Sequence, residues 1–333
     1  MANAFNRQVL LAEKPSGKLS PSHFKLVDGK MPEPKDGEVL LRTRLISLDA
    51  ANRAWMQGAT YRAAVEANTV MAGGSISEVV SSKAPGFAAG DLIFADTGWQ
   101  DYAALPAKHL IKVPKIEPMS YLLSVYGIAG LTAYFGLLNI GQPKEGNTVV
   151  VSAAAGSVGS IVGQIAKIKG CRVVGIAGGA EKCKWLTSEL GFDAAVDYKN
   201  TALFKELKAA APNGIDVYFD NVGGDVFETC LFQMNNRGRI ACCGAVSQYD
   251  GAPSATGPRG VPGLIVVKRL TVQGFIVTDF NDQRDKALAD LQSWVASGKL
   301  KVQEDIIDGI ENTPQALIGL LNGENRGKRM VRV

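Results

Sequence analysis

The chain has 333 residues, more than one hydrophobic core usually supports, so its length predicts two domains that share a cleft. Its 46% hydrophobic and 20% charged residues are typical of a globular protein and exclude the disordered and fibrous classes. The 36 basic and 32 acidic residues leave a formal net charge of +4 and are scattered along the chain, so we expect no nucleic-acid partner.

The apolar segments of the chain are too short to predict a membrane span. No uninterrupted run reaches the roughly 18 residues that a span needs, and the most apolar stretch, residues 125–140, predicts a buried helix. Residues 1–15 lack the layout of a secretory signal, and the five cysteines do not have the spacing of a disulfide framework. We therefore expect no membrane partner and a cytoplasmic location.

The first third of the chain has the pattern of a small β domain. Short β-like runs at residues 39–46, 76–80 and 92–94 are separated by Gly, Pro and Asp. Runs of this length and spacing predict a compact, partly open barrel.

After Pro118, short apolar runs alternate with helical stretches, which is typical of βαβ units. The predicted strands are residues 148–152, 172–177, 195–197, 215–220, 239–242 and 270–275, and the predicted helices are 157–169, 181–190, 203–211 and 226–234. Six strands with such crossovers predict a Rossmann-type, doubly wound parallel sheet. A further amphipathic helix is expected at residues 282–297.

The last thirty or so residues end in a β-like run, 329–333, and we expect them to rejoin the first domain. The predicted division is therefore one domain of residues 1–125 and 301–333 around a second domain of residues 126–300.

A glycine-rich turn follows strand 148–152 and opens a helix, the context in which a dinucleotide-binding fingerprint is meaningful. Against G-x-G-x-x-G, the three glycine positions hold Ala154, Gly156 and Gly159. Gly156 lets the backbone approach a pyrophosphate, Gly159 lets helix and strand pack closely, and the helix N-terminus offers unpaired N–H groups to phosphates. Ala154 weakens the match, and an ordinary tight βα turn is the alternative.

The end of the second strand indicates which dinucleotide binds. Folds that prefer NAD place Asp or Glu there, about 20 residues after the first glycine, but residues 177–180 carry no carboxylate. Lys182 can supply a charge to a 2′-phosphate, and Tyr198 a hydroxyl. The missing acid favours NADPH, whereas Glu181 would oppose this if it turned inward.

The supply of metal ligands argues against a metal site. Catalytic zinc needs about three convergent Cys, His or carboxylate ligands, and the chain has only two histidines, His23 and His109, and no Cys-rich loop. We expect no metal. Cys242 and Cys243 are interpreted as small core residues rather than redox centres.

Over nearly its whole length the chain resembles the medium-chain dehydrogenase/reductase superfamily. The matching segments are residues 47–49, 70–74, 85–91, 130–136, 153–167, 218–224, 274–277 and 325–328. Within the superfamily it is similar to the zinc-independent branch of leukotriene dehydrogenase/prostaglandin reductases, plant 2-alkenal reductases and bacterial curcumin reductase-like enzymes. The resemblance implies an α/β fold in which a GroES-like, partly open β-barrel joins the Rossmann domain. Gly73-Gly74 falls where zinc-dependent relatives bear a histidine–glutamate pair.

The resemblance also implies a homodimer that uses NADPH to reduce the carbon–carbon double bond of α,β-unsaturated ketones or aldehydes, with hydride delivered to the β-carbon. The implied cofactor shell is Gly156, Ser157, Val158, Gly159, Lys182, Tyr198, Asn221, Cys243, Tyr249, Phe275, Val277 and Asn325, with Thr132 beside the nicotinamide.

No Ser/His/Asp or Cys/His constellation is evident, so we expect a hydroxyl to stabilise the enolate: Tyr249, Tyr61 or the cofactor ribose. In an equally weighted interpretation, Tyr61 packs a loop. Asn52 aligns the substrate carbonyl in one interpretation and caps a turn in the other.

Two departures from the relatives leave the substrate open. The chain has Asp-Ala-Ala-Asn-Arg at residues 49–53, where relatives often carry Asp-Pro-Tyr-Met-Arg, and Val267 where plant and animal members have a tyrosine. We therefore expect an altered substrate pocket. A quinone or carbonyl reductase of the same fold and a non-catalytic NADPH-binding protein are the alternative functions.

Overall fold

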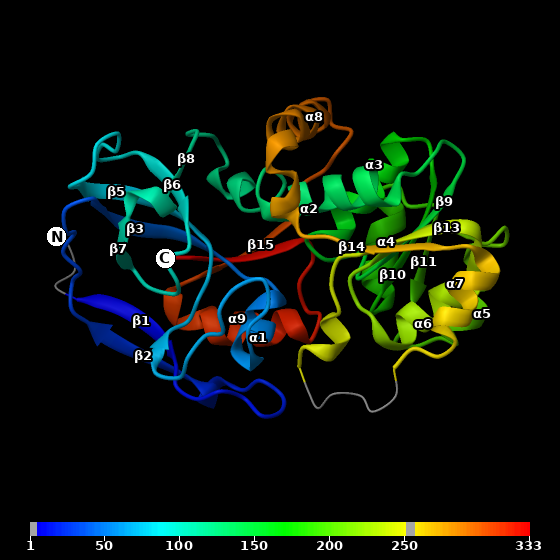
Figure 1. Cartoon of the computed structure of the whole chain (residues 1–333), viewed down its shortest axis with the longest axis horizontal. Coiled ribbons are helices and arrows are strands. Elements are labelled where there is room, and N and C mark those ends of the chain that lie inside the picture. The colour runs from blue at the N-terminus through cyan, green and yellow to red at the C-terminus, as the bar shows by residue number, and fades with distance from the viewer. Residues whose placement is uncertain (1–4, 251–256) are drawn as a thin grey trace.

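The structure is a computed structural model that describes residues 5–250 and 257–333, and a six-stranded parallel sheet forms one half of it (Figure 1). The strand order is β11-β10-β9-β12-β13-β14. The strands are β9 (Thr148–Ser152), β10 (Arg172–Ala177), β11 (Ala194–Asp197), β12 (Ile215–Asp220), β13 (Met234–Cys242) and β14 (Thr271–Gly274). The chain order reverses between β9 and β12, so the carboxyl ends of these strands border a topological switch point.

Helices cover both faces of this sheet. They are α2 (Ile128–Phe135), α3 (Gly159–Ile168), α4 (Ala180–Ser188), α5 (Leu203–Ala210), α6 (Gly224–Gln233), α7 (Val261–Lys268) and α8 (Arg284–Ala296). Val149 and Val151 of β9 pack in one core cluster with α2, α3, α4 and α8. Val150, between them, packs in a second cluster with α5 and α6. A strand buried on both faces needs a continuous apolar run, which is why the valine-rich sequence forms the centre of the sheet.

The other half of the molecule contains two further sheets. The larger has the order β15-β16-β3-β5-β6-β8, with β7 also paired to β3, and the smaller has the order β2-β1-β4. The strands are β1 (Asn6–Leu11), β2 (Phe24–Gly29), β3 (Glu38–Ser47), β4 (Thr69–Val70), β5 (Ser75–Ser82), β6 (Leu92–Ala95), β7 (Tyr102–Pro106), β8 (Ile111–Val113), β15 (Glu304–Asp308) and β16 (Lys328–Arg332). β16 pairs antiparallel with β3, so the end of the chain returns to the sheet that the first third began.

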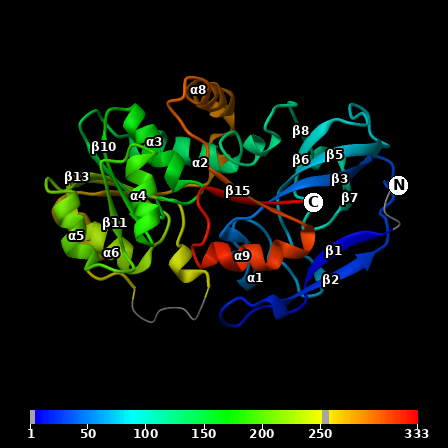
Figure 2. The same cartoon turned by 180° about the vertical axis from the view of Figure 1, so that it is seen from behind.

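Two helices, α1 (Ala51–Gln57) and α9 (Thr313–Leu321), lie together beside these sheets, as Figure 2 shows from behind. Trp55 and Met56 of α1 share one core cluster with Ala316 and Leu317 of α9. This packing holds α1 at the side of the barrel that faces the parallel sheet.

The predicted α/β class with a Rossmann-type sheet is confirmed, and the regular strands β9, β10 and β12 have the predicted bounds. The single helix expected over residues 125–140 is wrong in detail, because α2 ends at Phe135 and a π-helical segment, Gly136–Gly141, follows. A Cβ on Gly136 would lie 2.3 Å from Phe275 Cζ and 2.6 Å from Phe219 Cε2, so these two rings occupy the space beside the widened turn. No helix in the described ranges has the length and apolar character that crossing a bilayer requires.

Candidate functional site

The glycine-rich turn lies between β9 and α3, at the switch point of the sheet. Ala153 adopts a left-handed conformation with φ of 47°, and its carbonyl accepts the Gly156 N–H at 2.9 Å. A Cβ on Gly159 would lie 2.4 Å from the Ala153 oxygen and 2.8 Å from Ala154 Cα, which are backbone atoms. Only glycine therefore lets α3 start this close to the strand. No side chain caps α3 in the described residues, and no hydrogen bond there uses the N–H groups of residues 157–159, so these groups can meet an anion.

Ala154, the departure from the fingerprint, fits the turn because a glycine faces it. The Ala154 side chain is fully buried, and a Cβ on Gly175 of β10 would lie 3.0 Å from it. The methyl group at the first motif position thus occupies the space that Gly175 leaves open.

A segment near the C-terminus, residues 325–327, lies against the same turn. The Gly327 N–H donates to the Ala155 oxygen at 2.9 Å, and Gly156 and Gly327 form an isolated parallel bridge. Asn325 is buried, and its side-chain amide donates to the Gly327 oxygen at 2.8 Å. Asn325 is thereby placed beside the glycines although it lies more than 160 residues further along the sequence.

The tip of β10 carries glycines that leave room for longer side chains. A Cβ on Gly178 would lie 2.9 Å from Lys199 Cε and 3.1 Å from Tyr198 Cε1, so both side chains lie over Gly178. The nearest carboxylate, Asp197, accepts the Gly179 N–H at 2.8 Å, a bond that lowers the pKa of Asp197. The tip is therefore bordered by the side chains of Tyr198 and Lys199, and the Asp197 carboxylate is occupied by the backbone.

Lys182 on α4 lies within a group of cations. Its ammonium donates to the Gly323 oxygen at 2.6 Å. Burial lowers the pKa of Lys182, and the positive charges of Lys199 and Arg326 lower it further. A bound dianion would relieve this repulsion, so the group is suited to a phosphate monoester.

Glu181 pairs with one of these cations, Arg326, at the surface and does not turn inward. Its carboxylate lies 3.0 Å from the Arg326 guanidinium and its side chain is 90% exposed. Sequence reasoning missed Lys199 and Arg326. The sequence did offer a signal for both, because Lys199 directly follows Tyr198 and Arg326 directly follows Asn325, and Tyr198 and Asn325 were predicted site residues.

The residues after β12 and β13 meet at the carboxyl edge of the sheet. The Asn221 amide donates to the Ser152 oxygen at 2.7 Å, and the Cys243 N–H donates to the Asp220 oxygen at 2.8 Å. Tyr249 accepts the Ala245 N–H on its hydroxyl oxygen at 3.1 Å. Ligands bind at this edge in doubly wound sheets.

The two cysteines at the end of β13 are not activated thiols. Burial raises the pKa of Cys243 to about 12 and that of Cys242 to about 11, and the charge of Asp220 adds to both rises. Both thiols are therefore neutral near pH 7.

The predicted nicotinamide neighbours come from α2 and the end of β14. Phe275 contacts the backbone at Gly136, one turn after Thr132, and its ring centroid lies 6.2 Å from that of Phe219. Thr132 is half-buried, and Phe275 and Val277 pack against the core cluster that includes the α2 side chains.

Tyr61 lies in the loop after α1 and is 62% exposed, with its ring edge-on to Trp55 at 6.3 Å between centroids. Burial of the hydroxyl raises the pKa of Tyr61, and the charges of Asp49 and Tyr249 add to the rise.

Asn52 is buried and makes the contacts of a turn cap, which is one of the two interpretations of its role. Its side-chain oxygen accepts the Asp49 N–H at 2.7 Å, and its amide donates to the Ala72 oxygen at 3.1 Å. A contact of Asn52 with substrate stays a prediction. Sequence reasoning also missed Lys328, whose ammonium donates to the Leu48 oxygen at 2.9 Å and to Asp49.

Gly73 has no room for a side chain, because a Cβ there would lie 2.8 Å from Trp99 Nε1. The resemblance implies a histidine–glutamate pair at this segment in zinc-dependent relatives, where this chain has two glycines. Residues 5–250 and 257–333 contain no group of three His, Cys, Asp or Glu side chains that could hold a metal ion.

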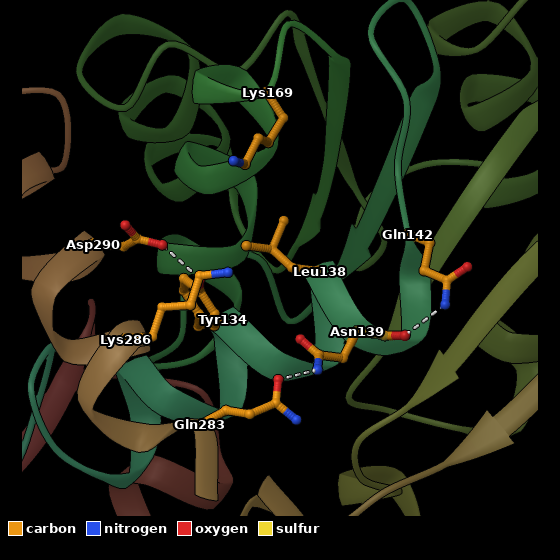
Figure 3. A pocket seen from close by; sticks show the side chains of 8 residues that line it. All are labelled: Tyr134, Leu138, Asn139, Gln142, Lys169, Gln283, Lys286 and Asp290. Atoms are coloured by element: carbon orange, nitrogen blue, oxygen red, sulfur yellow. Dashed lines mark hydrogen bonds between the residues drawn. The ribbon is translucent and has the colours of Figure 1, made fainter.

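A pocket of about 490 Å³ opens between α2 and α8, but none of the predicted site residues lines it. Figure 3 shows Tyr134 and Asp290 pointing toward each other, with the Tyr134 hydroxyl donating to the carboxylate at 2.6 Å. The pocket includes Lys169, at the opposite end of α3 from the glycine turn, about 15 Å away at the rise of an α-helix.

The reversed strand order, the glycine turn and the residues gathered at the carboxyl edge define a dinucleotide-binding α/β protein. Residues 7–113 match the family model described as the N-terminal domain of oxidoreductase, and residues 157–293 match the one described as zinc-binding dehydrogenase.

Three similar proteins indicate more specifically which kind of oxidoreductase the chain resembles. It is 44% identical to the NADPH-dependent curcumin reductase of Escherichia coli, over 98% of this chain and 97% of that one. It is 45% identical to prostaglandin reductase 1 of Bos taurus, over 93% and 94% of the two chains. The crystal structure of CurA from Vibrio vulnificus in complex with NADPH superposes with a TM-score of 0.94 at 42% identity, over 98% and 99% of the two chains.

The chain therefore belongs to the medium-chain dehydrogenase/reductase superfamily, in the branch of prostaglandin, curcumin and 2-alkenal reductases. The predicted GroES-like β-barrel beside the Rossmann sheet is confirmed with it.

Proposed function

We propose that this protein is an NADPH-dependent reductase of the carbon–carbon double bond in α,β-unsaturated ketones and aldehydes. The observation that carries the proposal is the glycine turn beside the tip of β10, which carries no carboxylate of its own and has Lys182, Lys199 and Tyr198 around it. The names of the E. coli and Vibrio vulnificus relatives, which specify NADPH, support the same cofactor.

The chain's own residues fit this cofactor at both of its charged groups. We assign Gly156, Ser157, Val158 and Gly159 to the pyrophosphate, since the uncapped start of α3 presents N–H groups there. Lys182 and Tyr198 are assigned to the 2′-phosphate. The remaining assignments follow the carboxyl edge of the sheet and the segments beside it: Asn221, Cys243, Tyr249, Phe275, Val277 and Asn325, with Thr132 beside the nicotinamide.

Bound NADPH would supply a hydride to the β-carbon of the activated alkene. As that bond forms, the π electrons move to the carbonyl oxygen, and the protein must stabilise the resulting negative charge. Tyr249 is suited to this task because its oxygen accepts the Ala245 N–H, which leaves its own proton to be donated. Tyr61 is the second candidate donor, and solvent would protonate the α-carbon.

The function is tested by following NADPH absorbance with a panel of enones, enals, quinones and saturated ketones. We expect turnover with the enones and enals and little with saturated ketones. Oxidation confined to quinones or saturated carbonyls would assign the chain to another reductase of this fold, and NADPH binding without any turnover would make it a binding protein. Tyr249→Phe should lower kcat with an enone, and unchanged turnover would remove Tyr249 from its role.

We also propose a homodimer, formed at the outer edge of the parallel sheet. Val266 and Val267 on α7 are 73% and 67% exposed, and α7 packs on β13, the neighbour of the edge strand β14. Exposed apolar side chains next to an edge strand are a surface that a second copy can cover. Sedimentation should show a dimer for the wild type and a shift toward monomer for Val267→Lys.

Two further assignments belong to this proposal. The division into residues 1–125 with 301–333 and residues 126–300 is supported by the strand membership of the sheets. A cytoplasmic location is supported by the five cysteines, all of which are free thiols.

A further inference from the structure

A buried ion pair joins helix α1 to the loop that follows β13. The Arg53 side chain is 1% exposed, and its Nε lies 2.9 Å from Asp250 Oδ1. The same guanidinium donates to the Gly17 oxygen at 2.7 Å, and the same carboxylate oxygen accepts the Leu19 N–H at 2.8 Å. Three segments that are far apart in the sequence therefore meet at one pair of charges, on the side where the chain after β13 approaches α1 (Figure 1).

A second contact from α1 holds the neighbouring residue of that loop. The Gln57 amide donates to the Tyr249 carbonyl oxygen at 3.0 Å. Residues 53 and 57 lie one helical turn apart and share one face of α1. Consecutive residues, Tyr249 and Asp250, are thus each held by one side chain from this face.

These contacts fix the backbone of Tyr249, and a separate contact holds its hydroxyl. The Tyr249 oxygen accepts the Ala245 N–H at 3.1 Å, and a Cβ on Gly244 would lie 3.4 Å from it. The main chain of Tyr249 is held from the barrel side and its hydroxyl from the Rossmann side. The orientation of the phenol therefore depends on both halves of the molecule.

Stability alone does not account for this arrangement. Removing a guanidinium from water is costly, and a buried ion pair often stabilises a fold less than apolar residues of the same volume would. Moreover, Arg53 Nη1 is buried without a hydrogen-bond partner in the described residues, which adds to the cost. A hydrogen-bonded ion pair fixes the relative orientation of its two partners more strictly than apolar packing does.

We propose that Arg53, Gln57 and Asp250 form a latch that positions Tyr249 to donate its proton to the substrate oxygen. The proposal rests on the proposed function, in which Tyr249 stabilises the enolate. Arg53, Gln57 and Asp250 are positioning residues, because they act on the reaction through Tyr249 and not by touching substrate.

The test is a double-mutant cycle read in kcat with an enone at saturating NADPH. Asp250→Asn should lower kcat about tenfold in the wild-type background, because small displacements of a donor reduce rates steeply. In a Tyr249→Phe background it should lower kcat no further, since the group that the latch positions is gone. The same factor in both backgrounds would overturn the proposal. Asp250→Glu should restore most of the loss.

Two further variants test whether a loss of kcat reflects general damage to the fold. Gln57→Ala, at an exposed residue, should show the same dependence on Tyr249 with a smaller loss. Asp308→Asn removes a partner of Arg332 in an exposed pair on the barrel and should leave kcat unchanged. A loss in Asp308→Asn as large as in Asp250→Asn would count against the latch.

Hydrogen exchange separates the latch from the proposed function. If the wild type reduces no activated alkene, the proposed function fails, but the latch still predicts faster exchange of the Ala245 amide in Asp250→Asn, by about tenfold. Unchanged exchange at Ala245 would overturn the latch whatever the enzyme's activity. Faster exchange with no change of kcat in an active enzyme would refute its positioning role.

Discussion

Two alanine substitutions in the glycine turn are expected to separate stability from cofactor binding. Gly159→Ala places a methyl group 2.4 Å from the Ala153 oxygen and 2.8 Å from Ala154 Cα. Both obstacles are backbone atoms, so the start of α3 must move away from β9. Overpacking of this kind costs about 1–3 kcal/mol, which for a protein of this size lowers Tm by roughly 1–4 °C.

Gly156→Ala is the matched control for stability. The nearest atom to its Cβ is the Ala153 oxygen at 3.2 Å, a contact that a shift of a few tenths of an ångström relieves. We expect a stability change within about 0.5 kcal/mol. Because the second motif glycine lets the backbone approach the pyrophosphate, the added methyl should weaken NADPH binding about tenfold or more, equivalent to about 1.4 kcal/mol.

Thermal denaturation and fluorescence titration with NADPH measure the two effects on the same samples. Gly159→Ala should lose both stability and affinity, and Gly156→Ala mainly affinity. Wild-type affinity in Gly156→Ala, or a wild-type Tm in Gly159→Ala, would refute the reasoning about the turn.

Two other predictions concern charged groups. Because the pKa of Lys182 is below its usual 10.5, the ammonium deprotonates earlier as pH rises, so KM for NADPH should increase at a lower pH than an unperturbed lysine would produce. Lys182→Arg should remove this pH dependence because arginine stays charged, and a parallel dependence in that variant would refute a role for Lys182. Burial raises the pKa of Asp49, but Lys328 outweighs it and the net shift is downward. The pair therefore stabilises the fold above the unfolded-state pKa near 3.8, and this contribution is lost as pH falls through the lower folded value. Lys328→Met should cost about 1–2 kcal/mol in urea denaturation at pH 7, a figure reduced because the Asp49 side chain is 37% exposed. The difference from wild type should shrink in acid, and equal stability at pH 7 would contradict the assignment.

The parts of the fold that local pattern determines could be predicted from the sequence. The run of valines in β9 has neighbours on both faces, so its apolar character alone identified the central strand and its bounds. The turn at Gly156 and Gly159 was equally readable, because a close approach of helix and strand leaves no alternative to glycine. Ala154 was harder to interpret, since the glycine that accommodates it, Gly175, lies on another strand.

The parts that long-range contacts determine could not be predicted. Lys199 and Arg326 join Lys182 only because α4, the loop after β11 and the segment before β16 converge in the fold. Likewise, Arg53 and Asp250 are 197 residues apart, and neither residue's neighbours indicate the other. The π-helical segment after α2 lies against two aromatic rings, one from β12 and one from the residue after β14, and no helical periodicity records such contacts.

The central claim, hydride transfer from NADPH to the β-carbon of an activated alkene, is tested most directly by isotope transfer. The enzyme is supplied with an unsaturated ketone and with NADPH that carries deuterium at both C4 positions of the nicotinamide, and the product is examined by mass spectrometry and NMR. We expect a saturated ketone with one deuterium on the β-carbon. An alcohol with deuterium on the former carbonyl carbon, or recovery of the unlabelled substrate, would contradict the account.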